Sequence, residues 1–123
     1  MAQEEQTLRS PVRQPFRLYA ANGRIYARNR TQKVIDLGAL ARQAGGAFRW
    51  ELDGNHHAGD GFFTEEEALR DVAASIRFLW LDGQFTAVAD ARDDPALNLD
   101  GAVHVDIELD EMPPGERAYD ATV

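Results

Sequence analysis

Residues 64–83 read TEEEALRDVAASIRFLWLDG, and they predict a helix around which the rest of the chain can be arranged. Thr64 is a favourable N-cap residue, and Glu67, three positions later, can return a hydrogen bond to the backbone as in a capping box. Asp82 and Gly83 supply the expected stop, since glycine tolerates the left-handed conformation that closes a helix. The apolar residues follow the spacing of one helix face: Leu69, Val72, Ala73, Ile76, Leu79 and Trp80. A helix with one apolar stripe needs a sheet to cover that stripe.

The composition indicates a single soluble domain. A chain of 123 residues can bury a core without covalent staples, and the absence of cysteine excludes a disulfide-built secreted module. No apolar run approaches the roughly 20 residues that span a bilayer, and the polar start has no signal-peptide core. We therefore expect no membrane contact and a cytoplasmic location.

Charge is distributed unevenly along the chain. Residues 1–50 carry three acids and nine bases, a sum of +6, whereas residues 51–123 carry eighteen acids and four bases, a sum of −14, which together give the net charge of −8. Such an asymmetry suggests an electrostatic partner, either another molecule or the other half of the same fold. A basic protein surface fits the acidic half, and nucleic acid does not.

A hairpin is the clearest element of the N-terminal half. Residues 1–14 are polar and predict a flexible arm, and order is expected to begin at Phe16. Asn22-Gly23 lies between two apolar runs and predicts a two-residue type I′ turn, because both central residues of that turn need positive φ. The register then requires pairs whose numbers sum to 45, so that Tyr19 faces Tyr26 and Arg17 faces Arg28.

The segment 31–46 can be interpreted in two ways. Residues 33–36 could extend a strand, while residues 36–43 could form a short helix with Leu37, Leu40, Ala41 and Ala44 facing inward, and we favour the helix. Residues 47–53 alternate cleanly and predict a half-buried strand. Residues 54–61 are rich in turn formers and predict a loop.

The C-terminal half adds two more expected strands. Residues 84–90 predict a weak strand with Phe85, Ala87 and Ala89 on one side, and residues 103–110 predict a strong one by strict alternation. The fold class that follows is α+β, an antiparallel sheet of about five strands with one long and one short helix packed on one face. We expect one domain over residues 15–111 and an acidic tail over residues 112–123.

A row of carboxylates on the last strand is the first candidate binding site. Side chains two residues apart lie about 6.7 Å apart on one strand face, so Asp106, Glu108 and Asp110 should form a line that Glu111 extends. Asp93, Asp94 and Asp100 come shortly before it in sequence. The row could compete for a lysine- and arginine-lined groove, or it could simply keep an exposed strand soluble.

The outer face of the hairpin is the alternative binding face. It carries Arg17, Tyr19, Arg24, Tyr26 and Arg28, and Arg30 and Lys33 follow. Arg17 opposite Arg28 is unfavourable unless an anion lies across them, and paired tyrosines give flat contact area of the kind that stacks bases. Asp106 or Glu108 from a neighbouring strand could instead neutralise these arginines within the fold.

A metal-dependent hydrolase at His56, His57 and Asp60 is a further alternative. Adjacent histidines on one loop do not easily face one ion, and neither the i, i+4 zinc spacing nor a second ligand pair is present, so exposed histidines are the better interpretation. No phosphate-binding loop, nucleophile elbow or catalytic triad is recognisable. We therefore predict no metal site, no cofactor and no catalytic residues.

Two resemblances bear on function. Residues 61–68, Gly61-Phe62-Phe63-Thr64-Glu65-Glu66-Glu67-Ala68, follow an aromatic strand and resemble the strand-to-helix junction of AP2 and integrase arm-type DNA-binding modules. By size, acidity and lack of cysteine, the whole chain resembles small acidic inhibitors of phages and mobile elements, of the anti-CRISPR and DNA-mimic types. This second resemblance implies a non-enzymatic inhibitor whose acidic half binds a basic, nucleic-acid-binding surface of a host defence complex. The sequence leaves the partner and the oligomeric state open.

Overall fold

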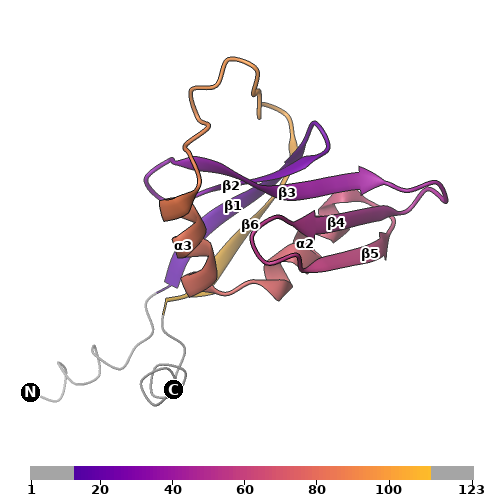
Figure 1. The fold of residues 1–123 in the computed structure, drawn as a ribbon, viewed down its shortest axis with the longest axis horizontal. Helices are drawn as coiled ribbons and strands as arrows, with labels where there is room; N and C mark the ends of the chain where they lie inside the picture. Colours follow the sequence, from indigo (N-terminus) through magenta and orange to yellow (C-terminus); the bar gives the residue numbers. More distant parts are fainter. Residues whose placement is uncertain (1–12, 112–123) are drawn as a thin grey trace, which may run out of the picture.

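The computed structural model describes residues 13–111, which form a six-stranded sheet and two helices (Figure 1). Apart from Arg13 and Gln14, the expected arm lies outside the described residues, as does the expected tail over residues 112–123. The elements follow in the order β1 (Arg13–Ala21), β2 (Arg24–Arg28), β3 (Val34–Arg42), β4 (Phe48–Leu52), β5 (Ala58–Phe62), α2 (Glu65–Ser75), α3 (Phe78–Ala87) and β6 (Val103–Asp110). The α+β class and the antiparallel sheet are confirmed, but the sheet has six strands and not about five.

The sheet order is β5-β4-β3-β2-β1-β6, and every neighbouring pair is antiparallel. The first five strands form a meander, and the last strand returns to lie beside the first. The hairpin prediction is confirmed, because Arg17 pairs with Arg28 and Tyr19 with Tyr26. Asn22 and Gly23 have φ of 55° and 75°, as a type I′ turn requires.

The favoured short helix over residues 36–43 is wrong, because this segment is the strand β3. The register between β2 and β3 shifts at Ile25 and Tyr26, so that β3 carries a β-bulge at Leu37. The bulge inserts one extra residue and interrupts strict alternation, which makes the apolar spacing resemble that of a helix. The carboxylate of Asp36 accepts a hydrogen bond from the N–H of Gly38 at 3.2 Å and so supports the irregular backbone.

The sixth strand, β5, comes from the segment predicted to be only a loop. Residues 53–57 do turn the chain, but residues 58–62 then pair with β4. Turn-forming residues hid this strand, since Gly59 and Gly61 are poor strand formers. Gly59 is nevertheless needed here, because a Cβ atom would come within 2.6 Å of the Asp71 carboxylate and 2.7 Å of the Trp50 indole nitrogen.

The expected helix over residues 64–83 is two helices, α2 and α3, of 11 and 10 residues. The N-cap is confirmed: the Thr64 hydroxyl accepts a hydrogen bond from the N–H of Glu67 at 3.0 Å, while the Glu67 carboxylate accepts one from Phe63 at 2.9 Å. Extended backbone at Ile76 and Arg77 separates the helices. The expected stop at Gly83 and the expected strand over residues 84–90 are both wrong, because α3 continues to Ala87.

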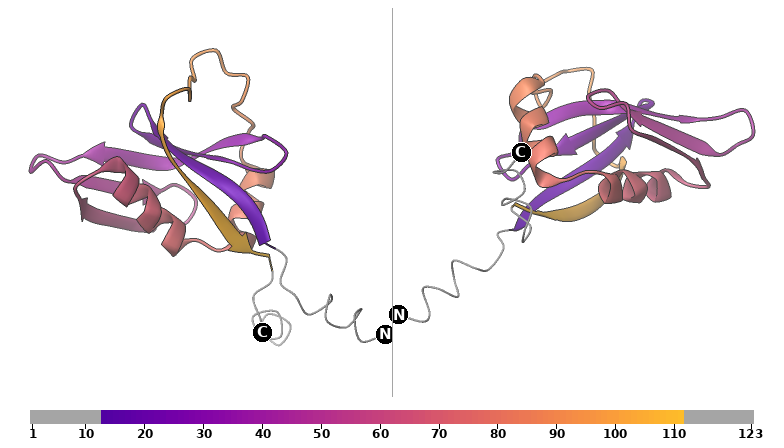
Figure 2. Two further views of the ribbon diagram at one scale, coloured as in Figure 1. Left: turned by 180° about the vertical axis from the view of Figure 1, so that it is seen from behind. Right: turned by 60° about the horizontal axis from the view of Figure 1, so that its bottom comes forward.

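Buried side chains of both helices and of the sheet form one hydrophobic core, and Figure 2 shows that the helices lie at different parts of the sheet, α2 next to β4 and β5 and α3 next to the start of β1. Phe16 of β1 lies beside two rings of α3, with its centroid 6.2 Å from that of Phe78 and 5.8 Å from that of Phe85. The buried indole of Trp50 on β4 donates a hydrogen bond to Asp71 of α2 at 3.0 Å. No helix within residues 13–111 is long and apolar enough to cross a membrane. The face of the sheet that points away from this core, called here the outer face, carries the charged side chains.

Candidate partner-binding surface

The outer face brings the two predicted charge rows side by side. Because β6 pairs with β1, Asp106 lies opposite Arg17, which in turn lies opposite Arg28 on β2. The guanidinium of Arg17 donates two hydrogen bonds to the carboxylate of Asp106, from Nε to Oδ1 at 2.6 Å and from Nη2 to Oδ2 at 3.1 Å. These hydrogen bonds lower the pKa of Asp106 and raise that of Arg17, against the opposing effect of desolvation. The unfavourable Arg17–Arg28 pair is therefore offset within the fold.

The rest of the carboxylate row is also partly neutralised. Arg13 on β1 contacts Asp110 at 3.0 Å and Glu108 at 3.6 Å. Glu111 accepts a hydrogen bond from the side chain of Gln14 at 3.0 Å. The side chains of Asp106 and Glu108 nonetheless remain 66% and 58% exposed, because β6 is the last strand of the sheet. One side of each of these two carboxylates stays open to a partner.

The aromatic part of the predicted basic face is not an open platform. Tyr19 is only 4% exposed, because the guanidinium of Arg28 lies 5.6 Å from the centre of its ring and His104 lies 5.9 Å away on the other strand. Tyr26 is half-buried, and its pKa is raised by desolvation first and by Asp36 second. The tyrosines therefore act in packing on the outer face, and a base could not stack on Tyr19 without displacing Arg28.

Arg24 is held in a charge network of its own. Its guanidinium contacts Asp36 at 3.1 Å and Asp53 at 2.5 Å, joining β2 to β3 and to the turn that follows β4. The hydrogen bond with Asp36 is the main reason why the pKa of Arg24 is raised. Lys33 donates a hydrogen bond to the carbonyl of Phe85 near the end of α3, where a cation complements the helix dipole. Neither cation is free for a ligand without a loss of these contacts.

A groove of about 560 Å³ runs along the outer face between β6, β1 and the turn after β2. Three arginines line it, Arg17, Arg28 and Arg30, together with Asp106 and Glu108. Among residues 13–111, Arg28 and Arg30 form no ion pair, and the Arg30 side chain is exposed. The Asn29 side chain organises the turn by accepting hydrogen bonds from the backbone N–H groups of residues 31 and 33. The groove is therefore pre-formed, with cationic groups on one side.

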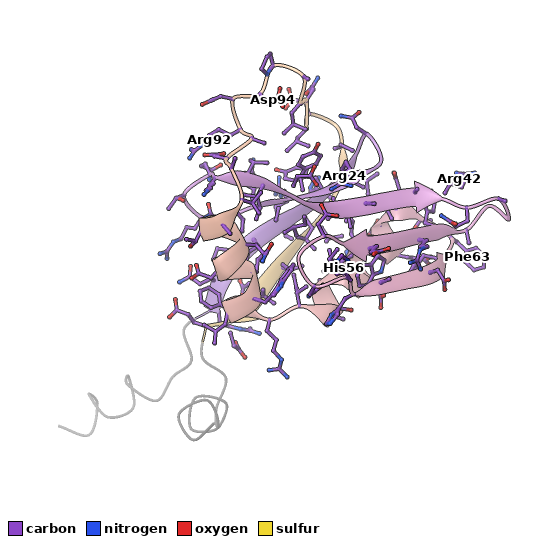
Figure 3. The ribbon with its side chains drawn as sticks, in the orientation of Figure 1. Arg24, Arg42, His56, Phe63, Arg92 and Asp94 are labelled. Carbon is purple, nitrogen blue, oxygen red and sulfur yellow. The ribbon has the colours of Figure 1, made fainter. Side chains whose placement is uncertain are left out.

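The remaining predicted site residues lie on the segment 88–102, called here the acidic loop, which joins α3 to β6 and projects beyond the sheet (Figure 1). It is fastened to the start of β3, because Ala91 N–H donates to the Val34 carbonyl at 2.7 Å and Asp90 accepts from the Val34 N–H at 3.1 Å. Figure 3 shows Asp94 near the top of the loop. In the part of the chain that the structure describes, Asp93, Asp94 and Asp100 are exposed and form no ion pair.

The histidine segment does not assemble a metal site. His56 and His57 are exposed in the turn before β5, and within residues 13–111 the carboxylate that comes within 4 Å of either ring is that of Glu51, 3.5 Å from His56 Nδ1. Asp60 lies on β5 opposite Arg49. Within the described residues no three ligand-type side chains converge on one point. The geometry gives the metal-dependent hydrolase no support, so we do not propose it.

Sequence reasoning missed Arg13, Asn29 and Gln32. Arg13 falls within the predicted arm, but in the structure it belongs to β1, where it pairs with Asp110 and neutralises part of the acidic row. The signal in the sequence is the spacing: Arg13, Pro15 and Arg17 are two residues apart, as side chains on one face of a strand are. Asn29 and Gln32 belong to a turn whose shape only the structure reveals, and Gln32 has a φ of 72°.

Comparison with known proteins gives no relative. No known protein family, curated protein or solved structure matches the chain. The two resemblances stated above therefore remain predictions, and the functional argument rests on the surface of the molecule itself.

Proposed function

We propose that this protein is a non-enzymatic interaction protein that binds a basic protein surface through the acidic edge of its sheet. The observation that carries the proposal is the position of β6, which places Asp106 and Glu108 on the last strand with well over half of each side chain exposed. The acidic loop leads directly into this strand and adds Asp93, Asp94 and Asp100. These five exposed carboxylates are called here the acidic margin.

The partner class that fits this margin is a protein that itself binds nucleic acid. Such proteins carry lysine- and arginine-lined surfaces, which an acidic margin could occupy in place of the nucleic acid. Because Arg13 and Arg17 neutralise part of the β6 row, we propose competition for a basic surface and not a close copy of the nucleic-acid backbone. A defence complex of a prokaryotic host is one such partner, and binding to it would make the protein an inhibitor.

The test is capture of partners from nuclease-treated host lysate, washed at rising salt. One variant combines Asp93→Asn, Asp94→Asn and Asp100→Asn, and a second combines Asp106→Asn and Glu108→Gln. The matched control is Asp60→Asn, Glu65→Gln and Asp82→Asn, which removes the same charge as the first variant from side chains outside the acidic margin. We expect wild type and control to retain a nucleic-acid-binding protein that both margin variants lose, and wild type to release it as salt rises. Equal capture by all four proteins would refute the proposal.

A second candidate is an anion-binding module that uses the groove, favoured by the unpaired Arg28 and Arg30. A phosphate group could bridge these two cations, which no carboxylate among residues 13–111 does. The test is a gel shift at low salt with single- and double-stranded oligonucleotides, where phosphate binding is strongest. Arg30→Gln should weaken a real shift, while Arg70→Gln on α2 should leave it unchanged. No shift at low salt would refute this candidate.

A further inference from the structure

The groove on the outer face exists because β2 is shorter than its neighbour β1. β1 pairs with β6 from Arg13 onward, whereas its pairing with β2 begins only at Arg17, opposite Arg28. Pro15 lies in the part of β1 that has no β2 residue beside it, and proline suits this position because it has no N–H to leave unpaired. The chain turns away after Arg28 and leaves a hollow of about 560 Å³. This volume is in the range of roughly 300–1,000 Å³ that is typical of small-molecule sites.

The turn over residues 29–33, which forms one wall of the groove, is held in a fixed shape. The side-chain oxygen of Asn29 accepts hydrogen bonds from two backbone N–H groups of the turn, at 3.1 Å and 2.9 Å. Arg92 of the acidic loop donates a hydrogen bond to the carbonyl of Thr31 at 3.3 Å. Gln32 has a φ of 72°, a left-handed conformation that persists in such a residue only where the surroundings impose it. A pre-organised turn therefore presents Arg30 at the groove.

The two walls of the groove carry opposite charges. Arg28 and Arg30 line it on the side of the turn, and Asp106 and Glu108 line it on the side of β6. Because β1 lies between β2 and β6, the backbones of the two walls are about 10 Å apart, which is two strand spacings. The apolar residues that line the groove are Pro15, Phe16 and Ile107.

Both walls retain capacity for a charged ligand. Within residues 13–111 neither Arg28 nor Arg30 forms an ion pair. Glu108 contacts Arg13 at 3.6 Å, and its side chain stays 58% exposed. An anionic ligand would satisfy only the arginine wall, and a cationic ligand would satisfy only the carboxylate wall. A ligand that carries both charges at its two ends satisfies both walls at once.

We propose that the groove binds a small zwitterion. The anionic group lies between Arg28 and Arg30, the cationic group lies at Asp106 and Glu108, and an apolar chain between them lies along the apolar lining. An ω-amino acid is the simplest molecule of this class. The inference goes beyond the proposed function, because a small molecule and not a partner protein occupies the groove.

The probe is 6-aminohexanoate, whose ammonium and carboxylate groups stand at the two ends of a short apolar chain. Hexanoate and hexylamine are the matched controls, since each keeps the chain and removes one of the two charges. Binding to the full chain is measured by titration, and the backbone amide resonances that shift on binding locate the ligand. The expected shifts are at residues 28–32 and 106–108.

We expect 6-aminohexanoate to bind at least about tenfold more tightly than either control, because each of its ends adds a charge-assisted hydrogen bond. Arg30→Gln should lower its affinity toward that of hexylamine. Glu108→Gln should lower its affinity toward that of hexanoate and should not weaken the binding of hexanoate itself. Arg70→Gln is the control variant, because Arg70 pairs with Glu66 on α2 and does not line the groove, so it should change none of these affinities.

Three results would overturn the proposal: equal affinities of the three ligands, no binding of 6-aminohexanoate, or shifted resonances that lie away from the groove. A further probe is the amide of the dipeptide lysyl-glutamate, acetylated at its N-terminus, which carries the same two charges on side chains. Tighter binding of this dipeptide than of 6-aminohexanoate would overturn the small-molecule assignment and give the groove to a protein segment.

The variant that lacks the three carboxylates of the acidic loop separates this inference from the proposed function, because none of the three lines the groove. If this variant loses the captured partner and wild type does not bind 6-aminohexanoate, the proposed function stands and the groove ligand is refuted. If all proteins capture equally and wild type binds 6-aminohexanoate in the groove, the proposed function fails and the groove ligand stands.

Discussion

Gly38→Ala tests the fold, because a loss of stability is expected if residue 38 lies in a strand and a gain is expected if it lies in a helix. A Cβ atom at this position would lie 2.2 Å from the backbone carbonyl oxygen of Glu51 and 2.8 Å from the Cα of Leu52, both on the neighbouring strand β4. Ordinary contact begins at 3.4 Å, so the β4 backbone would have to move by about 1 Å. A backbone carbonyl in a sheet cannot rotate away as a flexible side chain can. Gly38→Ala should therefore destabilise the protein by about 3 kcal/mol, at the upper end of the usual cost of overpacking.

The alternative interpretation of the sequence predicts the opposite result. If residues 36–43 formed a helix, Gly38→Ala would stabilise the protein by about 1 kcal/mol, because alanine is the better helix former. The assay is urea unfolding followed by circular dichroism, with Gly45→Ala as the control. Gly45 lies in the turn after β3 and a Cβ there meets nothing within 4 Å, so its substitution should change stability by less than about 0.5 kcal/mol. In a thermal scan, the expected difference between the two variants is roughly 15 °C. A Gly38→Ala protein as stable as Gly45→Ala would refute the β3–β4 register.

Three further predictions concern single contacts. Asp71→Ala leaves the buried indole N–H of Trp50 without its acceptor and should lower the free energy of unfolding in urea by about 1–3 kcal/mol. Asp71→Asn keeps an acceptor and should lower it clearly less. Equal losses of stability in the two variants would contradict the hydrogen bond. Hydrogen bonding, first from the Arg92 backbone, lowers the pKa of Asp90 from 3.8 to about 2, so its ionised form stabilises the folded state above about pH 4 and that stability is lost as the pH falls toward 2. Asp90→Asn should flatten the dependence of the melting temperature on pH in this window, and an unchanged slope would argue against the shift. Thr64→Ala should cost about 1 kcal/mol by removing the cap of α2, while Thr64→Ser should retain most of the stability.

The parts of the fold that could be predicted are those fixed by local chemistry. Asn22-Gly23 determines its own turn type and hence the whole register of β1 and β2, and Thr64 determines where α2 begins. The alternation of residues 103–110 is strict enough to identify β6 without any knowledge of its neighbours. In each case the signal lies within about ten residues of the feature that it predicts.

The errors arose where the periodicity changed within a segment. At Ile76 and Arg77 the chain leaves the helix and starts another, which turns Leu79 outward and Leu81 inward, although both remain apolar in the sequence. The bulge of β3 similarly shifts alternation by one residue at Leu37. A period inferred from one side of such a break does not apply on the other, and nothing in the residue types marks the break itself.

Whether the acidic row is free or neutralised depends on the strand order, which cannot be inferred from the sequence alone. Both charge rows were identified, but whether Asp106 would meet Arg17 or a partner depended on β6 returning to β1. The sequence therefore predicted the chemistry of the acidic row, while its partial neutralisation by Arg13 and Arg17 required the tertiary fold.

The return of β6 to β1 also affects how the sheet can be made. Arg13 and Asp110 hydrogen-bond although they are 97 positions apart, so this pairing closes a loop that contains almost every other described residue. During synthesis β1, β2 and β3 can form their meander early, but β1 has only one neighbour until β6 has left the ribosome. A nascent chain that has paused after β5 exposes a β1 edge that the finished protein covers. Mispairing at this stage threatens β1, and the strand that later covers it, β6, is the last of the described strands to be made.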